Sequence, residues 1–396
     1  MRILIAPDKF KGCLSSADVA SAIAAGVREA LPAAIIDLCP IADGGEGTVD
    51  ALVAATSGRL FTRTVTGPLP HMRVPATFGL LGDATTAVIE MAAASGLHLL
   101  NREQYNPLAT TTYGTGELIL AALHAGARKI ILGIGGSATV EAGIGCLQAL
   151  GFIPTLNADL AQDPQKPKAI APRVSPLPTL TRPFTAAGLP YLQSVQPTTL
   201  LNQFRPFEIL VACDVTNPLT GPTGAARIYG PQKGATPAQV DWLDNQLARF
   251  ANLIPNGPAI ATTPGAGAAG GLGFGLLAFL NAKLQSGFDL ISRAVNLESR
   301  IAASDLILTG EGKLDASSLH GKTAIGVARL CQQHNKPCIA LVGALEENIL
   351  PTAHAQGLTS AHAICHHPAD LATAIASAPK LLRELAAQFM RTDYRV

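Results

Sequence analysis

The segment TGEGKLDASSLHGK, residues 309–322, concentrates side chains that can bind anions and metal ions. Carboxylates can hold Mg²⁺ or accept a proton from a hydroxyl group, and a histidine or lysine can neutralise a phosphate or carboxylate. The residues of these types are Glu311, Lys313, Asp315, His320 and Lys322. Each alone has a structural alternative, such as a capped aspartate or a surface lysine. Their density after one predicted strand favours a catalytic loop.

The same segment ends in Gly321-Lys322-Thr323, which is also how a P-loop ends. A P-loop has a glycine five residues before the Gly-Lys pair and follows a strand directly. Here Ala316 stands at that position, and eleven residues separate the predicted strand 305–309 from Gly321. We therefore expect this segment to bind phosphate by other means, if it does so.

Two lysines follow the first apolar run of the chain. In PDKFKG, Asp8, Lys9 and Lys11 lie between a predicted strand, residues 2–6, and a predicted helix. Lysines beside a helix N-terminus suit an anion, because unpaired N–H groups and the helix dipole add to their charge. The alternative is a solvated charged turn.

The motif IADGGEGT places Asp43 at the end of a predicted strand, residues 35–42. Gly44 and Gly45 would let a ligand approach the backbone closely, and Glu46 follows them. A carboxylate here could hold Mg²⁺ or act as a base. A tight turn that caps the next helix is the structural alternative, and the two are compatible.

Three further loops follow the same pattern. GIGGSATVEAG (133–143) contains Gly135, Gly136 and Ser137, which could form a nest for phosphate oxygens or a plain turn. ACDVTNPLTGPTGAA (212–226) places Asp214 and Asn217 in an elaborate loop, which favours ligand binding. The glycines of TPGAGAAGGLGFG (263–275) could wrap a substrate or serve as a hinge.

Alternating strands, loops and helices predict an α/β fold with a largely parallel sheet. The other predicted strands are residues 129–134, 207–213, 305–309, 337–342 and 361–365. Ser15 and Asp18 have the spacing of a capping box, and apolar residues then recur every four positions through residue 31, as on one helix face. In open parallel sheets ligands bind at the carboxyl ends of strands, where these loops lie.

A second domain with more β character is predicted to begin near residue 60, because residues 59–90 alternate Thr, Val and Arg and read as three strands. Residues 151–206 are rich in Pro, Gln and Thr and are interpreted as an irregular excursion. A helix-rich run follows Pro231. We predict a discontinuous Rossmann-like domain, residues 1–59 plus 288–396, and an inserted α/β domain, residues 60–287.

The bulk composition excludes several classes of protein. The chain of 396 residues is 48% hydrophobic and 14% charged, with a net charge of +1 and 5% aromatic residues. The chain therefore has neither the excess of positive charge nor the aromatic residues for base stacking that nucleic-acid binding needs. Seven scattered cysteines suggest reduced thiols, and no apolar run is long enough to span a bilayer, so a cytoplasmic protein is expected.

The loops together point to phosphoryl transfer, which needs positive charge, Mg²⁺ ligands and a base near an alcohol. The sequence has no nucleophile elbow and no thiolate pair. From the residues alone, the protein is expected to be a two-domain α/β enzyme that handles phosphates.

The chain also resembles the glycerate kinase family of the bacterial type (type I), from Met1 to about Gly343. The matching motifs, in that family's order, are APDKFKGCLSSADVA, PIADGGEGTVDAL, TTTYGTGELILAAL, GIGGSAT, ACDVTNPLTGPTGAA, GPQKGA, PGAGAAGGLG and TGEGKLDASSLHGK. The resemblance implies phosphorylation of D-glycerate by ATP with Mg²⁺, to 2-phosphoglycerate or 3-phosphoglycerate. It also implies two α/β domains with the active site in the cleft between them.

On this interpretation the catalytic candidates are Asp43, Asp214, Asp315 and Lys9, and Asp43 and Asp315 are the candidate Mg²⁺ ligands. Which carboxylate is the base and which binds metal is left open. The candidate substrate or phosphate ligands are Asp8, Lys11, Gly44, Gly45, Glu46, Gly135, Gly136, Ser137, Asn217, Glu311, His320 and Lys322. A kinase of another small hydroxy acid and a non-catalytic metabolite sensor are the alternatives, and a homo-oligomer is left open.

Two stretches depart from the family pattern. After GGSAT the family continues Asn-Asp-Gly-Gly, whereas this chain has Val140-Glu141-Ala142-Gly143. If the family's aspartate serves substrate or metal, Glu141 stands in its place with a longer side chain. The Pro-rich residues 151–206 also match poorly.

Overall fold

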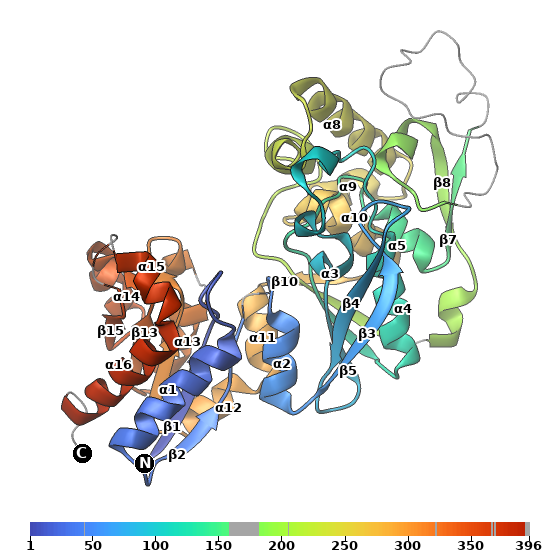
Figure 1. The fold of residues 1–396 in the computed structure, drawn as a ribbon. Helices are drawn as coiled ribbons and strands as arrows, with labels where there is room; N and C mark the ends of the chain where they lie inside the picture. The colour runs from blue at the N-terminus through green and yellow to red at the C-terminus, as the bar shows by residue number, and fades with distance from the viewer. Residues whose placement is uncertain are drawn as a thin grey trace. The chain divides into compact units, whose positions relative to one another are not determined.

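The computed structural model describes the chain except residues 43, 158–181, 205, 321–322, 366, 368–369 and 393–396; of His320 only the backbone is described (Figure 1). The chain divides into two compact units. The first comprises residues 1–43, 47–59 and 287–396, and the second comprises residues 44–46 and 60–286.

The first unit contains a five-stranded sheet in which all neighbours are parallel. Its order is β15-β13-β11-β1-β2, so the second strand along the chain lies at one edge and the first lies beside the third. This is a doubly wound arrangement with the flavodoxin-type strand order, whose topological switch point lies between β1 and β11. The strands are β1 (Arg2–Pro7), β2 (Ile35–Leu38), β11 (Leu306–Gly310), β13 (Cys338–Val342) and β15 (Ser360–Ala363).

Eight α-helices are described in this unit. They are α1 (Ser16–Ala30), α2 (Thr48–Thr56), α11 (Gly287–Ala294), α12 (Leu297–Ala302), α13 (Thr323–Gln333), α14 (Leu350–Ala355), α15 (Leu371–Ala376) and α16 (Ala378–Thr392). A short parallel pair, β12 (Lys313–Leu314) and β14 (Ala344–Leu345), extends the loops after β11 and β13.

Helix α1 has the N-terminal cap and the buried apolar face that its sequence pattern predicts. The side chain of Ser15 accepts the N–H of Asp18 at 3.1 Å and caps the helix, as its spacing predicts. Val19, Ile23 and Val27 are buried along one face, in the core cluster to which α16 also contributes. The two helices pack side by side (Figure 1), and a Cβ on Gly26 would lie 2.1 Å from the carbonyl oxygen of Arg383 in α16. Glycine is therefore required at this crossing.

The second unit contains a mixed six-stranded sheet in the order β10-β9-β6-β5-β4-β3. Strands β10, β9, β6 and β5 are parallel, and β4 runs antiparallel to β5. The strands are β3 (Arg59–Thr66), β4 (Arg73–Leu80), β5 (Thr86–Glu90), β6 (Lys129–Gly133), β9 (Glu208–Ala212) and β10 (Lys283–Gln285).

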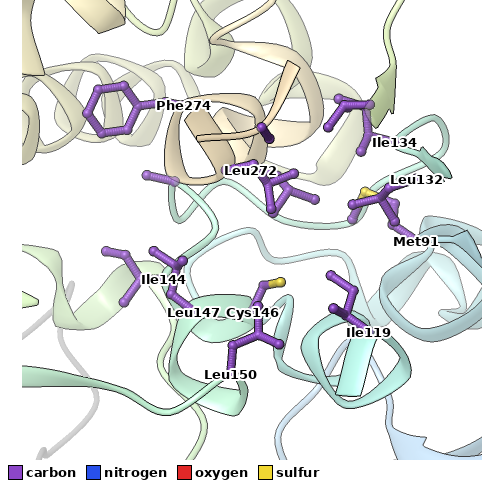
Figure 2. Packing of buried hydrophobic residues seen from close by; sticks show 14 of the residues in the cluster. Met91, Ile119, Leu132, Ile134, Ile144, Cys146, Leu147, Leu150, Leu272 and Phe274 are labelled. Atoms are coloured by element: carbon purple, nitrogen blue, oxygen red, sulfur yellow. The ribbon is translucent and has the colours of Figure 1, made fainter. Parts of the chain in front are cut away.

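The helices described in this unit cover that sheet or join its strands. They are α3 (Ala92–Ser95), α4 (Tyr113–His124), α5 (Ile144–Ala149), α7 (Ala225–Tyr229), α8 (Pro237–Asn252), α9 (Gly257–Ala261) and α10 (Ala268–Leu280). Figure 2 shows Ile119 of α4, Leu132 of β6, Leu147 of α5 and Leu272 of α10 within one buried apolar cluster. This core holds the carboxyl end of β6 in place.

Part of the predicted irregular excursion is regular. Strands β7 (Phe152–Leu156) and β8 (Leu192–Pro197) form an antiparallel pair, so the prediction of an irregular segment is wrong for these residues. Their pairing partners are about 40 residues apart, and such long-range pairing leaves only a short local pattern in each strand. Residues 158–181 and 205 lie outside the described residues.

The observed α/β class with parallel sheets confirms the predicted fold class. Several strands are shorter than predicted; β2, for example, ends at Leu38 rather than at residue 42. None of the helices in the described part of the chain combines the length and apolar character needed to cross a membrane.

Candidate functional site

A pocket of about 820 Å³ lies in the first unit, at the switch point of its sheet. The loops that follow β1 and β11 diverge there and leave space at the carboxyl ends of the strands. Its lining includes six residues that the sequence singled out, namely Asp8, Lys9, Lys11, Glu311, Lys313 and Asp315. The fold therefore brings together side chains that are about 300 positions apart in the sequence.

Asp8 connects the two loops of the pocket. Its backbone N–H donates to the carbonyl of Gly310 at 2.8 Å, which continues the pairing of β1 with β11. Its carboxylate accepts the N–H of Lys9 at 2.7 Å and the hydroxyl of Thr323 at 2.6 Å. Thr323 is the first residue of α13, so Asp8 holds the start of that helix beside the pocket.

Asp315 belongs to a charged cluster on another wall of the pocket. Its Oδ1 accepts the N–H of Ser317 at 2.9 Å and the Ser317 hydroxyl at 2.6 Å. Lys313 Nζ lies 3.6 Å from Asp315 Oδ2 and 2.5 Å from Glu346 Oε1. The hydrogen bond to Glu346, followed by the charges of Glu346 and Asp315, raises the pKa of Lys313. This cation therefore remains charged at neutral pH.

One side of the pocket is apolar, which the sequence did not reveal. Ile364, Leu371, Ala374 and Ile375 line it, and Leu371 and Ile375 are 48% and 45% exposed. Their i,i+4 spacing on the short helix α15 is the signal that could have pointed to this surface. A pocket with charges on one side and apolar surface on the other suits a ligand of mixed character.

A second group of predicted residues lies in the second unit, around the carboxyl end of β6. A Cβ on Gly133 would lie 2.5 Å from the carbonyl oxygen of Gly44, and one on Gly135 would lie 3.9 Å from the Cα of Gly45. Gly44–Glu46 therefore belong to this unit. The sequence-based prediction put these residues in the domain of residues 1–59 plus 288–396, and that boundary stays a prediction.

The loop after β6 rests on a lysine that was not among the predicted site residues. Lys233, the last residue of the 3₁₀ helix η5 (Pro231–Lys233), is 2% exposed. Its Nζ donates to Ser137 Oγ at 2.6 Å and to the carbonyl of Thr139 at 2.7 Å. Burial lowers its pKa to about 7. The signal available in the sequence was the motif GPQKGA, one of those that resemble the glycerate kinase family.

Glu141, the residue that departs from the family pattern, is buried with 1% exposure. Its carboxyl group accepts N–H bonds from Thr112 at 3.2 Å and from Gly145 at 2.8 Å, and it also contacts the Thr112 hydroxyl. Burial raises its pKa to about 7, and these hydrogen bonds act in the opposite direction. Glu141 thus fastens the starts of α4 and α5. The next residue, Ala142, has φ 57°, a left-handed conformation that favours glycine.

Asn217 organises its own loop. Its Nδ2 donates to the carbonyl of Thr223 at 2.8 Å, and its Oδ1 accepts the Tyr229 hydroxyl at 2.6 Å. Asp214 is exposed at the end of β9, beside β6 in the sheet.

The glycine-rich segment 263–275 packs directly on the loop after β6. A Cβ on Gly270 would lie 1.9 Å from the carbonyl oxygen of Thr139, and Ala142 N–H donates to the Gly270 carbonyl at 3.0 Å. Close packing between loops accounts for this glycine without a bound ligand.

The predicted residues thus fall into two groups. The first-unit pocket contains Asp8, Lys9, Lys11, Glu311 and Asp315, whereas the second unit contains Gly44, Gly45, Glu46, Gly135, Gly136, Ser137, Asp214 and Asn217. Asp43, Lys322 and the side chain of His320 lie outside what the structure describes. Within the described residues, no cluster of three or more His, Cys, Asp or Glu side chains is arranged to hold a metal ion.

Comparison with known proteins covers nearly the whole chain. The model of the "Glycerate kinase family" matches residues 3–393. A glycerate kinase of Bacillus subtilis (strain 168) is 46% identical over 88% of this chain and 86% of its own length. A glycerate 2-kinase of Escherichia coli (strain K12) is 44% identical over 92% of this chain and 90% of its own length.

A solved structure agrees with these sequence matches. The crystal structure of a candidate glycerate kinase 2 from Salmonella typhimurium LT2 superposes with a TM-score of 0.85 at 42% identity. The alignment covers 100% of this chain and 98% of that one. Family, sequence and fold agree over most of the chain, and the chain therefore belongs to the glycerate kinase family.

Proposed function

We propose that this protein phosphorylates D-glycerate at the expense of ATP and forms 2-phosphoglycerate. The observation that carries the proposal is the family match over residues 3–393, together with two groups of loops at the carboxyl ends of parallel strands whose side chains and glycines suit anions. The curated relative from Escherichia coli is named a glycerate 2-kinase, which favours the 2-hydroxyl over the 3-hydroxyl.

The first-unit pocket is the proposed nucleotide site. Its apolar side, with Leu371 and Ile375, suits a nucleoside base, and Lys9 and Lys11 suit the phosphates. Its volume of about 820 Å³ lies within the range of small-molecule sites.

The pocket also fits Mg²⁺, which proteins hold through one or two carboxylates and substrate phosphates rather than through an all-protein cage. Glu311 and Asp315 would supply the carboxylates from this pocket, and Asp43 remains a candidate from the sequence. The bound ion would neutralise charge on the transferred phosphoryl group.

Asp214 is the proposed general base. It is exposed at the end of β9, and the adjacent strand β6 leads to the loop of Ser137. A base must lie within hydrogen-bond reach of the hydroxyl from which it takes a proton, so an acidic residue beside an anion-binding loop is suited to the task. Lys9 would assist by stabilising charge on the phosphates.

The test is ³¹P and ¹³C NMR of the purified chain with ATP, Mg²⁺ and D-glycerate, with L-glycerate and no acceptor as controls. We expect a new phosphomonoester coupled to C2. Coupling to C3 would assign the 3-hydroxyl instead. A folded protein that binds ATP but gives no product would overturn the proposal in favour of another hydroxy acid or a metabolite sensor.

A further inference from the structure

Lys233 is a buried cation for which the proposed chemistry has no role so far. It is 2% exposed, and its Nζ contacts two neutral oxygens, the Ser137 hydroxyl and the Thr139 carbonyl. The centroid of the Tyr229 ring lies 6.0 Å from Nζ. Burying a lysine is costly unless its charge is paired, so a fold that keeps one here needs a compensating reason.

No carboxylate within the described chain forms an ion pair with Lys233, and burial is the only cause of its lowered pKa. Two titratable groups belong to the same surroundings: Tyr229, whose ring faces Lys233 and whose pKa is raised by burial, and Glu141 on the same loop as Ser137. Glu141 is engaged by Thr112 and Gly145. An anion that arrives from solution would therefore supply the missing charge.

Ser137 is the group through which such an anion would reach Lys233. Gly135 and Gly136 are exposed, whereas Ser137 is 8% exposed. The loop is pinned on both sides of Ser137, because the Gly136 carbonyl accepts the Leu97 N–H at 2.9 Å and the Ala138 N–H donates to the Ser95 carbonyl at 2.9 Å. Behind it, the hydroxyl of Thr139 is buried and has no hydrogen-bond partner among the described residues.

The protonation state of Lys233 determines whether the Ser137 hydroxyl can donate a hydrogen bond to a ligand. An ammonium group has three donors and no acceptor, so Ser137 Oγ must accept from it and can direct its own proton toward a ligand. A neutral amine has a lone pair that can accept the Ser137 proton instead. The hydroxyl is then lost as a donor to the ligand.

We propose that Ser137 and Lys233 form the subsite for the carboxylate of the small hydroxy acid that this protein phosphorylates. Ser137 donates to the carboxylate, and Lys233 is a positioning residue that acts through Ser137 and supplies the charge. One lysine and one hydroxyl suit a single negative charge, whereas the several lysines of the first-unit pocket suit the phosphates of a nucleotide. The inference rests on the proposed function, because that function defines the ligand.

The proposal predicts that binding takes up a proton. A carboxylate beside Lys233 raises the pKa of the amine above its unliganded value, so a partly neutral lysine becomes protonated as the ligand binds. At pH 7, uptake of up to about half a proton is expected if the unliganded pKa is about 7. Between pH 7 and pH 9 the affinity should fall by up to about tenfold per pH unit.

The experiment is calorimetric titration of D-glycerate into the full chain at pH 7 in buffers of different ionisation enthalpy, repeated at higher pH. Lys233→Met should abolish the uptake, flatten the pH dependence and weaken binding about tenfold or more. Ser137→Ala should weaken binding in a chain that differs by one oxygen atom. Lys283→Met, which removes an exposed lysine of the same unit, should behave like the wild type.

A second control excludes Glu141, whose pKa is also about 7. Uptake should persist in Glu141→Gln. Glycerate binding without proton uptake in the wild-type chain would overturn the inference, even if Lys233→Met failed to fold. So would an absence of glycerate binding, or uptake that Lys233→Met retains.

Inorganic phosphate and ADP serve as further ligands. Lys233-dependent uptake with either of them, and not with glycerate, would reassign the subsite to a phosphoryl group and overturn the carboxylate. Phosphoryl transfer is measured separately by NMR. A wild-type chain that forms phosphoglycerate without Lys233-dependent uptake would refute this inference and leave the proposed function standing.

Discussion

The two groups of candidate residues differ in whether their charged side chains are exposed and paired or buried. In the first-unit pocket, Lys313 is 53% exposed and is paired with Glu346 and Asp315, which raise its pKa. In the second unit, Lys233 and Glu141 are almost completely buried, and burial moves both pKa values to about 7 from opposite sides. Exposed, paired charges keep their charge over a wide pH range, whereas buried ones change protonation near neutrality.

The contrast has a chemical consequence. A nucleotide brings several negative charges and needs permanent cations, and the proposed nucleotide pocket would supply them. A substrate that carries one carboxylate can instead be bound beside a lysine that becomes protonated only when the ligand binds. The proposals assign these tasks to the first and second units respectively.

The largest expected effect is on catalysis, and it comes from replacing one carboxylate in each unit. Asp214→Asn should lower kcat by about 10²–10⁴-fold, the usual contribution of a general base, with little change in the KM for ATP. Asp315→Asn should act mainly by raising the KM for Mg·ATP. Steady-state kinetics with both substrates varied gives the answer, and unfolding curves check that each variant is folded. A near-normal kcat in Asp214→Asn would remove it as the base.

Glycine substitutions compare loop packing in the two regions. Gly12→Ala in the first unit places a residue at φ 72° in open space, so it should cost about 1–2 kcal/mol of unfolding free energy. Gly270→Ala has φ 69° and a Cβ 1.9 Å from the Thr139 oxygen, so the backbone must shift and the cost should exceed about 3 kcal/mol. Urea denaturation measures both. An equal loss of unfolding free energy in both variants would show that the second-unit loops can shift to accommodate a Cβ as easily as an open turn.

The pH dependence of stability separates buried from exposed charge. The pKa of Glu141 is raised from 4.5 to about 7, so the stability that this group contributes is fully present below pH 4.5 and is lost as the pH rises through 7. The pKa of Lys233 is lowered from 10.5 to about 7, so its contribution is present above pH 10.5 and is lost as the pH falls through 7. The two buried groups together place a minimum of stability near pH 7.

Glu141→Gln should therefore remove a decline in unfolding free energy on the order of 2–3 kcal/mol between pH 5 and pH 8. Urea denaturation at the two pH values gives this difference for the wild type and the variant. Glu103→Gln removes an exposed carboxylate of the same unit and should leave the difference unchanged. An unchanged difference in Glu141→Gln would mean that Glu141 is ionised in the native protein.

Helix caps give the smallest effect and test whether the two units unfold separately. Ser15 caps α1 in the first unit, and Thr236 caps α8 in the second, where the Thr236 N–H also donates to Gln239 Oε1. Ser15→Ala and Thr236→Ala should each cost about 1 kcal/mol. If the units are independent domains, calorimetry should show that each variant shifts a different transition. A single transition that both variants shift equally would contradict this.

Much of the fold could be predicted from local patterns. The cap at Ser15 and the apolar stripe through Val19, Ile23 and Val27 placed α1, and short apolar runs placed the buried strands. These features can be predicted because the spacing of apolar residues in a helix or a strand repeats over a few neighbouring positions. The β7–β8 pair was missed because each strand is short and finds its partner far away in the chain.

The candidate site was predictable in part. Charged loops after strands identified Asp8, Lys9, Lys11, Glu311 and Asp315, which line one pocket. Their roles as base, metal ligand or phosphate ligand stay predictions, as do the domain boundaries. The roles of Asp43 and Lys322 also stay predictions.

The sequence alone determined the α/β class, the family and the kinds of side chain available for chemistry, because these depend on residue types and short spacings. Only the tertiary structure decided that Lys233 stands behind Ser137, that Glu141 is buried structure and that Gly44 packs on the end of β6. The physical reason is that burial, and with it the charge state of a lysine or glutamate, depends on neighbours that the fold brings together from distant parts of the chain.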